Sequence, residues 1–526
     1  MKSSKNFNCT VGIDVGSSGI RLLLLNSKGI KVNEQIMTYT TLQEQGHLIW
    51  DEEKRINTNN LNESLENQLI LLLEKFPKIT IFSLSISSIG PSLVLLSKEA
   101  QPLVNAYTYA YQGAQDYVKY LPIDFQERTG SLYSGALPYV QLLKIKEETL
   151  LSSCFKITTI NDYLSWNMTD LPLNEIFSTV PNTSYTGLYS LKQRDWDLEL
   201  IQKVGLKKDI LPKIIPLGTT FPIKKELKQL SDSFKDTYVV TGTIDGIDAF
   251  WATGVENEDI IVGSASSTGA LRRLRKTPKK EYNSRLIQCC QINESLWVEL
   301  IPFNNVGTSF NWLGRNFGSM FKNYLIEKYQ LNIEKLELDS SNKLREKTTS
   351  LESYLLGLPL YFPYIEGEPR GPNGRGKIKG GFIFIKGYLP SCIDLYISLL
   401  IGIVNMYRHN LEMLDPPNYK EIRLTGLITQ KSRLFLQFLA SLINKRIVIM
   451  KSEQSIAWAT GMRALTYIKV REKIPKVSTL DPISPESGER QKLLTSLYRR
   501  YMEVYNSPNK YEICYSENEI NLQKLS

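Results

Sequence analysis

Two stretches of the chain, roughly 250 residues apart, share one pattern that constrains the fold. Each has a short apolar strand, a turn of glycine and hydroxyl residues, and a second apolar strand. The first copy spans residues 10–25, and the second spans residues 260–274. A separation of this length is too long for the period of a solenoid. The repeated pattern predicts two similar domains that face each other.

Strands and helices alternate along the chain, which is typical of an α/β protein. The 526 residues are enough for two or three domains, and 42% of them are apolar, as in globular proteins. The second half begins near Tyr238. Strands are expected at 80–85, 92–96, 239–240, 422–424 and 447–450, and helices at 61–76, 140–146, 248–253, 434–442, 456–468 and 489–505.

The most apolar segment runs from Leu395 to Tyr407 and is too short to span a bilayer. Ser391 and Asp394 precede or open it with the spacing of a capping pair, so a buried, capped helix is expected. The first residues contain no apolar run of a secretory signal. We therefore expect a cytoplasmic protein that does not enter a membrane.

The few histidines and cysteines exclude several kinds of site. The chain has two histidines, His47 and His409, and six cysteines, of which only Cys289 and Cys290 are neighbours. Zinc sites and nucleophiles that need a histidine base are therefore not expected. The net charge of +9 is scattered among acidic residues rather than concentrated in a stripe, so no nucleic-acid partner is expected.

A glycine-rich segment, Gly371–Lys377, matches most of the P-loop pattern for phosphate binding. However, Ile378 stands where the pattern needs a hydroxyl residue that binds magnesium. Pro372 and the glycines that follow indicate a surface loop instead. The P-loop interpretation is rejected.

The turn after the first strand is a better candidate for phosphate binding. Asp14 ends the strand, and Gly16, Ser17, Ser18 and Gly19 form the turn. Such a turn lets backbone N–H groups approach phosphate oxygens, and Asp14 could hold Mg²⁺ through water. Arg21 could face the same phosphates. The alternative is an ordinary hairpin with a glycine-rich turn.

The second half supplies the groups that phosphoryl transfer still needs. Ser266, Ser267, Thr268 and Gly269 form another turn of hydroxyl and glycine residues. Asp245 stands at the expected start of a helix and could accept the proton of a substrate hydroxyl. Phosphoryl transfer requires phosphate binding, a metal ion, a base and exclusion of water. Two alternatives are that Asp248 is the base, or that Asp245 only caps the helix.

These motifs resemble those of the FGGY carbohydrate kinases, which belong to the superfamily of actin, hexokinase and Hsp70. The segment Asp14 to Arg21 is similar to the family's first phosphate motif, and Gly242 to Gly246 is similar to the segment that carries its general base. Further similar segments follow in order up to residue 508: 179–188, 194–197, 364–370, 425–426, 459–464 and 481–505.

The resemblance implies an α/β fold of two ribonuclease-H-like domains that face a central cleft. The expected units are an N-terminal domain over 8–256, a C-terminal domain over 257–470 and a helical tail over 471–526. The implied enzyme transfers the γ-phosphoryl group of ATP, with Mg²⁺, to a primary hydroxyl of a small carbohydrate. A homodimer is compatible with this family.

The resemblance also assigns roles to individual residues. Asp245 is implied as the general base and Asp14 as the residue at the metal ion. The residues implied for ATP binding are Gly16, Ser17, Ser18, Arg21, Ser267, Thr268, Gly269 and Gly426. Those implied for substrate binding are Trp50, Tyr109 and Gly246.

The sequence departs from the family pattern at several of these positions. Ser266 and Leu427 stand where the family has glycine, and the stretch Tyr109–Gly113 lacks two charges of the usual sugar-binding motif. Ile49 replaces a carboxylate next to Trp50. Added Cβ atoms crowd close backbone contacts with phosphate and adenine. Two function classes are therefore considered: an active carbohydrate kinase, and an inactive relative that binds or regulates.

Overall fold

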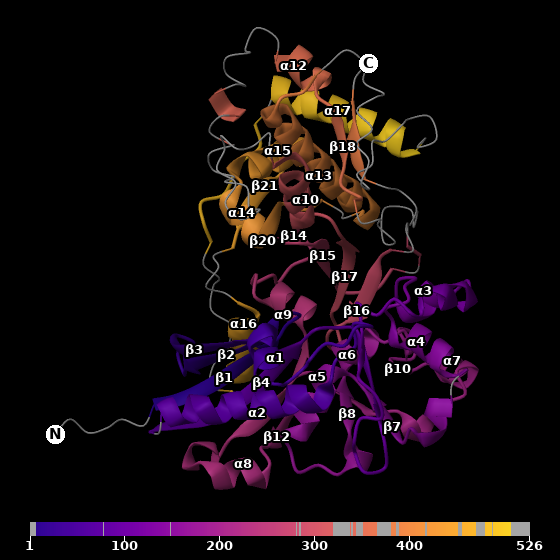
Figure 1. Cartoon of the computed structure of the whole chain (residues 1–526), viewed down its shortest axis with the longest axis vertical. Helices are drawn as coiled ribbons and strands as arrows, with labels where there is room; N and C mark the ends of the chain where they lie inside the picture. Colours follow the sequence, from indigo (N-terminus) through magenta and orange to yellow (C-terminus); the bar gives the residue numbers. More distant parts are fainter. Residues whose placement is uncertain are drawn as a thin grey trace, which may run out of the picture.

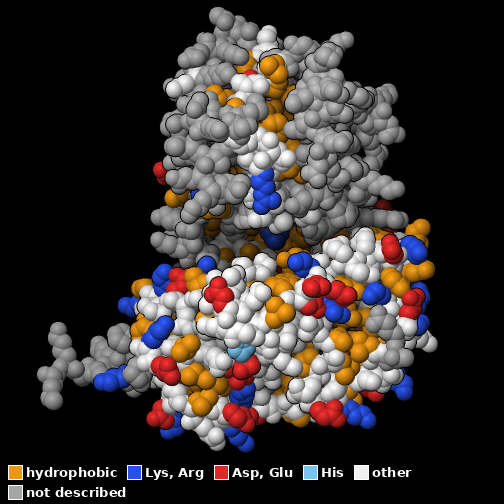
Figure 2. Space-filling model, viewed as in Figure 1, with side chains coloured by type: hydrophobic (Ala, Val, Ile, Leu, Met, Phe, Trp, Pro, Cys, Tyr) orange, Lys and Arg blue, Asp and Glu red, His pale blue; other side chains and the backbone are white. Residues whose placement is uncertain are grey.

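The computed structural model describes residues 7–76, 78–147, 149–279, 281–282, 286–318, 337, 340–342, 351–365, 380–384, 389–415, 418–450, 455–469, 479–486 and 488–506. These residues form two parts that are stacked along the long axis of the molecule, each with its own sheet (Figure 1). The prediction of an α/β fold with two such domains is confirmed. The space-filling view is hollowed where the two parts meet (Figure 2).

The first sheet contains the N-terminal strands. Its order is β12 (Thr220–Pro222), β13 (Tyr238–Ile244), β4 (Ile79–Ser88), β1 (Phe7–Val15), β2 (Gly19–Asn26) and β3 (Lys31–Thr38). Strands β1, β2 and β3 are antiparallel neighbours, whereas β4 and β13 run parallel to β1. The expected strands at 10–14, 21–25 and 80–85 are confirmed.

The second sheet repeats this arrangement. Its order is β16 (Gln288–Gln291), β17 (Trp297–Phe303), β15 (Gly269–Arg275), β14 (Ile260–Ala265), β20 (Glu421–Thr425) and β21 (Arg446–Ile449). Strands β14, β15 and β17 are antiparallel neighbours, whereas β20 and β21 run parallel to β14. The duplication inferred from the two strand–turn–strand segments is confirmed.

The prediction that the second half begins near Tyr238 is wrong. β13 pairs with β4 in the first sheet, with Tyr238 opposite Ser83, so it is the last parallel strand of the first half. The second half begins at β14. An apolar strand followed by glycine has the same local sequence at either end of a domain, and only its distant partner distinguishes the two cases.

Helix α2 (Thr58–Lys75) confirms the helix expected over 61–76. The Asn57 side chain accepts a hydrogen bond from the Asn60 N–H at 3.1 Å and caps the first turn. Leu61, Leu65 and Leu69 recur at helical spacing and are buried against the first sheet. The helix expected over 140–146 is α4 (Pro138–Ile145).

The strand expected over 92–96 lies outside the main sheets. It is β5 (Ser92–Leu96), which pairs with β6 (Tyr107–Thr108) and β7 (Lys156–Thr158). This small sheet packs against α5 (Ile160–Asn167) and carries the segment that includes Tyr109.

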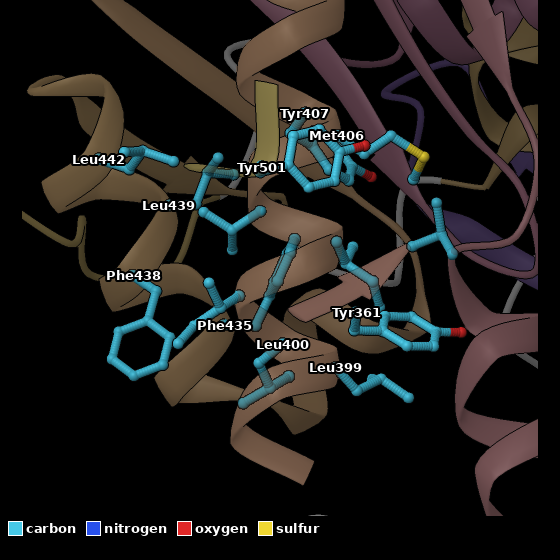
Figure 3. Packing of buried hydrophobic residues seen from close by; sticks show 14 of the residues in the cluster. Tyr361, Leu399, Leu400, Met406, Tyr407, Phe435, Phe438, Leu439, Leu442 and Tyr501 are labelled. Atoms are coloured by element: carbon cyan, nitrogen blue, oxygen red, sulfur yellow. The ribbon is translucent and has the colours of Figure 1, made fainter. Parts of the chain in front are cut away.

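Helix α13 (Cys392–Leu414) is the buried, capped helix that the sequence predicts. Ser391 and Asp394 form a capping box, and Asp394 also accepts a hydrogen bond from the Tyr354 hydroxyl at 2.7 Å. Figure 3 shows side chains of α13 packed against α15 (Arg433–Ile443) and against Tyr501 of α17 (Glu489–Asn506). Within the described residues, no helix is long and apolar enough to cross a membrane.

Helix α16 (Ile456–Tyr467) belongs to the late part of the chain but packs on the N-terminal sheet. It follows the second sheet in sequence but packs on β1, β2 and β4 of the first. The approach is close: a Cβ atom on Gly12 would lie 1.9 Å from the Ala457 carbonyl oxygen. Glycine at this position therefore lets helix and strand meet.

The other elements connect these layers. The remaining helices are α1 (Tyr39–Glu44), α3 (Phe125–Thr129), α6 (Val180–Ser184), α7 (Leu198–Lys203), α8 (Lys225–Leu230), α9 (Asp245–Trp251), α10 (Gly307–Phe317), α12 (Leu351–Gly357) and α14 (Leu427–Lys431). The short strands are β8 (Phe177–Thr179), β9 (Tyr189–Ser190), β10 (Asp195–Trp196), β11 (Lys213–Ile215), β18 (Leu360–Phe362) and β19 (Gly381–Ile383), and the 3₁₀ turns are Gln115–Tyr120, Thr149–Ser153, Leu173–Glu175, Lys208–Ile210 and Asp232–Phe234.

Candidate active site

Hydrogen bonds to its carbonyl oxygens hold the turn between β1 and β2 in place, while its two serine residues stay exposed. The Gly16 N–H donates to the Gly19 carbonyl at 3.0 Å, which closes the turn. Its carbonyl oxygens accept hydrogen bonds from Tyr39 and Trp50. Ser17 and Ser18 are exposed, and their backbone N–H groups donate to no acceptor among the described residues. Such N–H groups can bind an anion.

Asp14 precedes this turn and faces Arg21 across the β1–β2 ladder. Its Oδ1 atom is buried and has no hydrogen-bond partner among the described residues. The pKa of Asp14 is raised to about 7, first by burial and then by the nearby charge of Asp245, whereas Arg21 acts to lower it. Arg21 itself lies 3.5 Å from the Glu34 carboxylate. Asp14 therefore offers, beside the turn, a carboxyl oxygen without a hydrogen-bond partner in the described part of the chain.

Asp245 lies where β13 ends and α9 begins. Its Oδ1 atom accepts a hydrogen bond from the Gly246 N–H at 2.6 Å, which orients the carboxylate. Burial raises its pKa to about 6, while the Gly246 N–H and the charge of Arg272 act to lower it. No described Lys or Arg forms an ion pair with it. The structure thus brings Asp14 and Asp245 from two strands of one sheet into electrostatic contact.

Asp248, the alternative candidate for the base, has bonding partners within the protein. It is fully buried, pairs with the Arg463 guanidinium and accepts a hydrogen bond from the Thr460 hydroxyl at 3.1 Å. Both partners belong to α16. A carboxylate with two such partners is a structural link between α9 and α16, which leaves Asp245 as the carboxylate of α9 without an ion-pair partner among the described residues.

The turn between β14 and β15 mirrors the first turn. Ser266, Ser267 and Thr268 are exposed, and the backbone N–H groups of Ser267 and Thr268 donate to no acceptor among the described residues. The Gly307 N–H at the start of α10 donates to the Ser266 carbonyl at 2.7 Å and fixes the turn. Gly269 is buried, and a Cβ there would lie 2.2 Å from the Phe303 ring.

Gly426 lies against this second turn. Its φ of +107° is rarely adopted by residues with a side chain. A Cβ there would also lie 2.4 Å from the Ala265 carbonyl oxygen and 2.7 Å from the Ser266 hydroxyl oxygen. The neighbouring Leu427 is 58% exposed and does not fill this contact. The structure thus brings together Gly426 and the turn Ser266–Gly269.

The residues expected on the substrate side lie near the first turn. The Trp50 indole N–H donates to the Ser17 carbonyl at 3.1 Å, so Trp50 supports the turn between β1 and β2. Tyr109 is 37% exposed and is close enough to Tyr39 to influence its pKa. Asp51, next to Trp50, is paired with Arg55 at 2.9 Å.

Arg272 on β15 also lies in this region, although the sequence motifs did not predict it as a site residue. Its Nη2 atom lies 3.5 Å from the position that a Cβ on Gly246 would occupy, and its charge acts on Asp245. Its Nε atom is buried without a hydrogen-bond partner among the described residues. The alternation Ala270, Arg272, Leu274 could have shown it, because a charge stands at an inward position of that strand.

The residues present fit a hydrated Mg²⁺ ion rather than a metal held by protein ligands alone. Among the described residues, no three His, Cys, Asp or Glu side chains converge on one point. The unpartnered oxygen of Asp14 is a suitable acceptor for metal-bound water, which is how Mg²⁺ is often held beside phosphates.

The P-loop-like segment 371–377 lies outside the described residues, as does most of the family-like segment 364–370.

Comparison with known proteins relates the chain to two-domain sugar kinases. Residues 9–250 match the family model described as "FGGY family of carbohydrate kinases, N-terminal domain". This part of the chain is therefore an FGGY N-terminal domain, which confirms the resemblance seen in the motifs.

The curated relatives and solved structures agree with this assignment. A gluconokinase of Bacillus subtilis is 22% identical over 456 residues, which is 85% of each chain. A ligand-bound xylulose kinase from Lactobacillus acidophilus has a TM-score of 0.82 at 21% identity, covering 99% of this chain and all of that one. A gluconate kinase from the same organism has a TM-score of 0.82 at 21% identity, covering 95% and 98%. At these identities the structures establish the fold alone.

Proposed function

We propose that the chain is an ATP-dependent carbohydrate kinase that phosphorylates a primary hydroxyl of a sugar, polyol or sugar acid. One observation carries this proposal: Asp14 and Asp245 are electrostatically coupled and unpaired among the described residues, and each adjoins structure that suits the reaction. Asp14 adjoins a turn with free N–H groups, and Asp245 adjoins the junction of the two domains. Two such carboxylates destabilise a protein unless a ligand or metal uses them.

The two turns are the proposed phosphate sites. The free N–H groups and hydroxyls of Ser17, Ser18, Ser267 and Thr268 would bind phosphate oxygens from both sides. Gly426 would admit the adenosine part, since it lies directly on the second turn. We further propose that residues 8–256 carry the base and the acceptor side of the site, that 257–470 carry the nucleotide side, and that 471–526 form a helical tail.

Asp14 would hold the Mg²⁺ ion of MgATP, which neutralises charge on the phosphates when bound. Arg21 shares one face of the β1–β2 ladder with Asp14 and would adjust the charge there. The buried, unpartnered Oδ1 of Asp14 supports this assignment.

Asp245 is the proposed general base. As the acceptor oxygen forms its bond to phosphorus, its proton would pass to a carboxylate oxygen of Asp245. The Gly246 N–H holds the other oxygen, so the base has a fixed orientation. Its pKa of about 6 leaves most of the group ionised at neutral pH yet basic enough to accept a proton.

The alternative is an inactive relative that binds or regulates. Ser266 favours it, because its hydroxyl lies at the contact between the second turn and Gly426. Calorimetry that shows no MgATP binding would favour the inactive relative. An active kinase binds MgATP in the micromolar-to-millimolar range, whereas a relative that binds no nucleotide has lost the site.

The direct test is release of ADP from MgATP with a panel of ketoses, aldonates and polyols. We expect release that depends on one class of acceptor and stops when Mg²⁺ is chelated. Tight MgATP binding without acceptor-dependent release for any member of the panel would contradict the proposed function.

A further inference from the structure

Arg272 carries a charge that no protein group neutralises. It makes no hydrogen bond and no ion pair of 4 Å or less with any described residue, and its Nε atom is buried. Its neighbours in the row across the sheet are Val262 and Leu300, both buried and apolar. A guanidinium in such surroundings destabilises the protein unless an anion is supplied.

Another buried arginine in the described part of the chain has a built-in anion. Arg273, the next residue of β15, points to the opposite face of the sheet and pairs with Glu299 at 2.7 Å. Among the residues that the structure describes, Arg273 thus has an anionic partner, whereas the adjacent Arg272 has none. This contrast indicates that Arg272 binds an anion from outside the protein.

The position of Arg272 favours the acceptor side of the site. It lies on the sheet face that packs against α9, within reach of Gly246. It also stands three residues beyond Gly269, which is about 10 Å along a strand from the end of the second turn. The Arg272 guanidinium therefore lies beside the residue that follows the base, although β15 belongs to the second sheet.

Asp245 does not serve as the missing anion. It acts on Arg272 electrostatically, but no ion pair forms, and its Oδ1 is bonded to Gly246. A base that formed a full ion pair with Arg272 would be a weaker proton acceptor. Arg272 and Asp245 are thus two separate groups that one ligand can contact together.

We propose that Arg272 binds the carboxylate of the acceptor, so that the substrate class of this site is the sugar acids rather than neutral sugars or polyols. This inference rests on the proposed kinase function and deepens it. A guanidinium matches a carboxylate with two parallel hydrogen bonds. In an aldonate the carboxylate and the primary hydroxyl lie at opposite ends of the molecule, so one end can meet Arg272 while the other meets Asp245.

Calorimetry with a non-hydrolysable MgATP analogue tests this without requiring turnover. The ligands are a six-carbon aldonate and the six-carbon polyol that lacks its carboxylate. The wild-type protein is expected to bind the aldonate at least about tenfold more tightly. Arg272→Met should weaken aldonate binding about 10- to 100-fold and leave polyol and nucleotide binding unchanged. Arg272→Lys should recover part of the loss, because it keeps the charge but not the planar fork.

Arg275→Met is the matched control. It removes an arginine from the same strand, but Arg275 lies on the opposite face and donates to the Thr277 carbonyl at 3.1 Å. It should leave aldonate binding unchanged. Thermal melting checks that each variant is folded, and Arg272→Gln replaces Arg272→Met if the latter is not.

Two results of the calorimetry would overturn the proposal. One is polyol binding as tight as aldonate binding in the wild type. The other is an Arg272→Met variant that loses nucleotide affinity instead, which would assign Arg272 to a phosphate oxyanion. Failure of the kinase function is a separate result: aldonate binding that depends on Arg272, without any ADP release, leaves the Arg272 assignment intact. If the protein phosphorylates neutral sugars alone, the proposed role of Arg272 is wrong and the proposed kinase function is retained.

Discussion

Asp248 of α9 forms a buried ion pair with Arg463 of α16, three residues from the carboxylate of Asp245 that is left open. The pair ties the helix that begins at the proposed base to a helix from the far end of the chain. Arg463 also donates to the Ser85 hydroxyl of β4 at 3.1 Å. The two carboxylates of α9 therefore have separate tasks, one structural and one proposed to be catalytic.

The first prediction separates these tasks by paired substitutions. Asp245→Asn should lower turnover by about 10²- to 10⁴-fold, because the proton acceptor is lost while shape is kept. It should not lower the free energy of unfolding at pH 7, since the folded state raises the pKa of this group and thus disfavours its charge. The measurements are phosphoryl transfer to the best acceptor and denaturant unfolding.

Asp248→Asn is the counterpart and should show the reverse pattern. It leaves Arg463 buried without a counter-charge, which costs about 3 kcal/mol of unfolding free energy. Turnover per folded molecule should fall much less than in Asp245→Asn. If Asp245→Asn binds MgATP and turns over at the wild-type rate, Asp245 is not the base.

The second prediction is a pH profile with an acidic limb. The pKa of Asp245 is raised from 3.8 to about 6, so the base is protonated below that pH and ionised above it. The value of kcat/KM should rise about tenfold per pH unit below 6 and flatten above about 7. A profile that is flat from pH 5 to 8 would contradict the role of Asp245. MgATP binding measured over the same range shows whether Asp14 contributes to the limb.

The third prediction concerns the contact between Gly426 and the second turn. Gly426→Ala forces a side chain into a φ of +107° and against the Ala265 carbonyl, so the turn must shift. Nucleotide affinity should fall about tenfold or more, and the free energy of unfolding by about 1–3 kcal/mol. Gly318→Ala, where a Cβ would contact no described atom within 4 Å, is the control and should change neither.

The fourth prediction tests whether Trp50 supports the turn between β1 and β2, the first proposed phosphate site. Trp50→Phe removes the indole hydrogen bond to the Ser17 carbonyl, so the KM for MgATP should rise about 5- to 10-fold. Trp458→Phe is matched, because it removes an indole hydrogen bond to the carbonyl of Gly29 in another turn. Equal effects of both variants on the KM for MgATP would show that Trp50 acts only through general stability.

Local sequence was sufficient for the elements and for the two turns. The strands around Asp14 and Gly269 have only one arrangement that buries their apolar side chains. The glycine and hydroxyl residues between the strands form a tight turn with free N–H groups. The capping pair Ser391 and Asp394 likewise determined where α13 begins, because a cap needs only neighbours in sequence. These features depend on contacts within a few residues.

Only the tertiary structure decided which groups are paired and which are open. Asp245 and Asp248 are equivalent in sequence, and the difference arises because α16 brings Arg463 across the first sheet from over two hundred residues away. Arg272 and Arg273 are neighbours, yet one faces Glu299 and the other faces the domain junction. Strand β13 was assigned to the wrong half for the same reason, since its partner β4 is distant. The sequence determined the local shapes, and long-range packing determined the free charges that make a site.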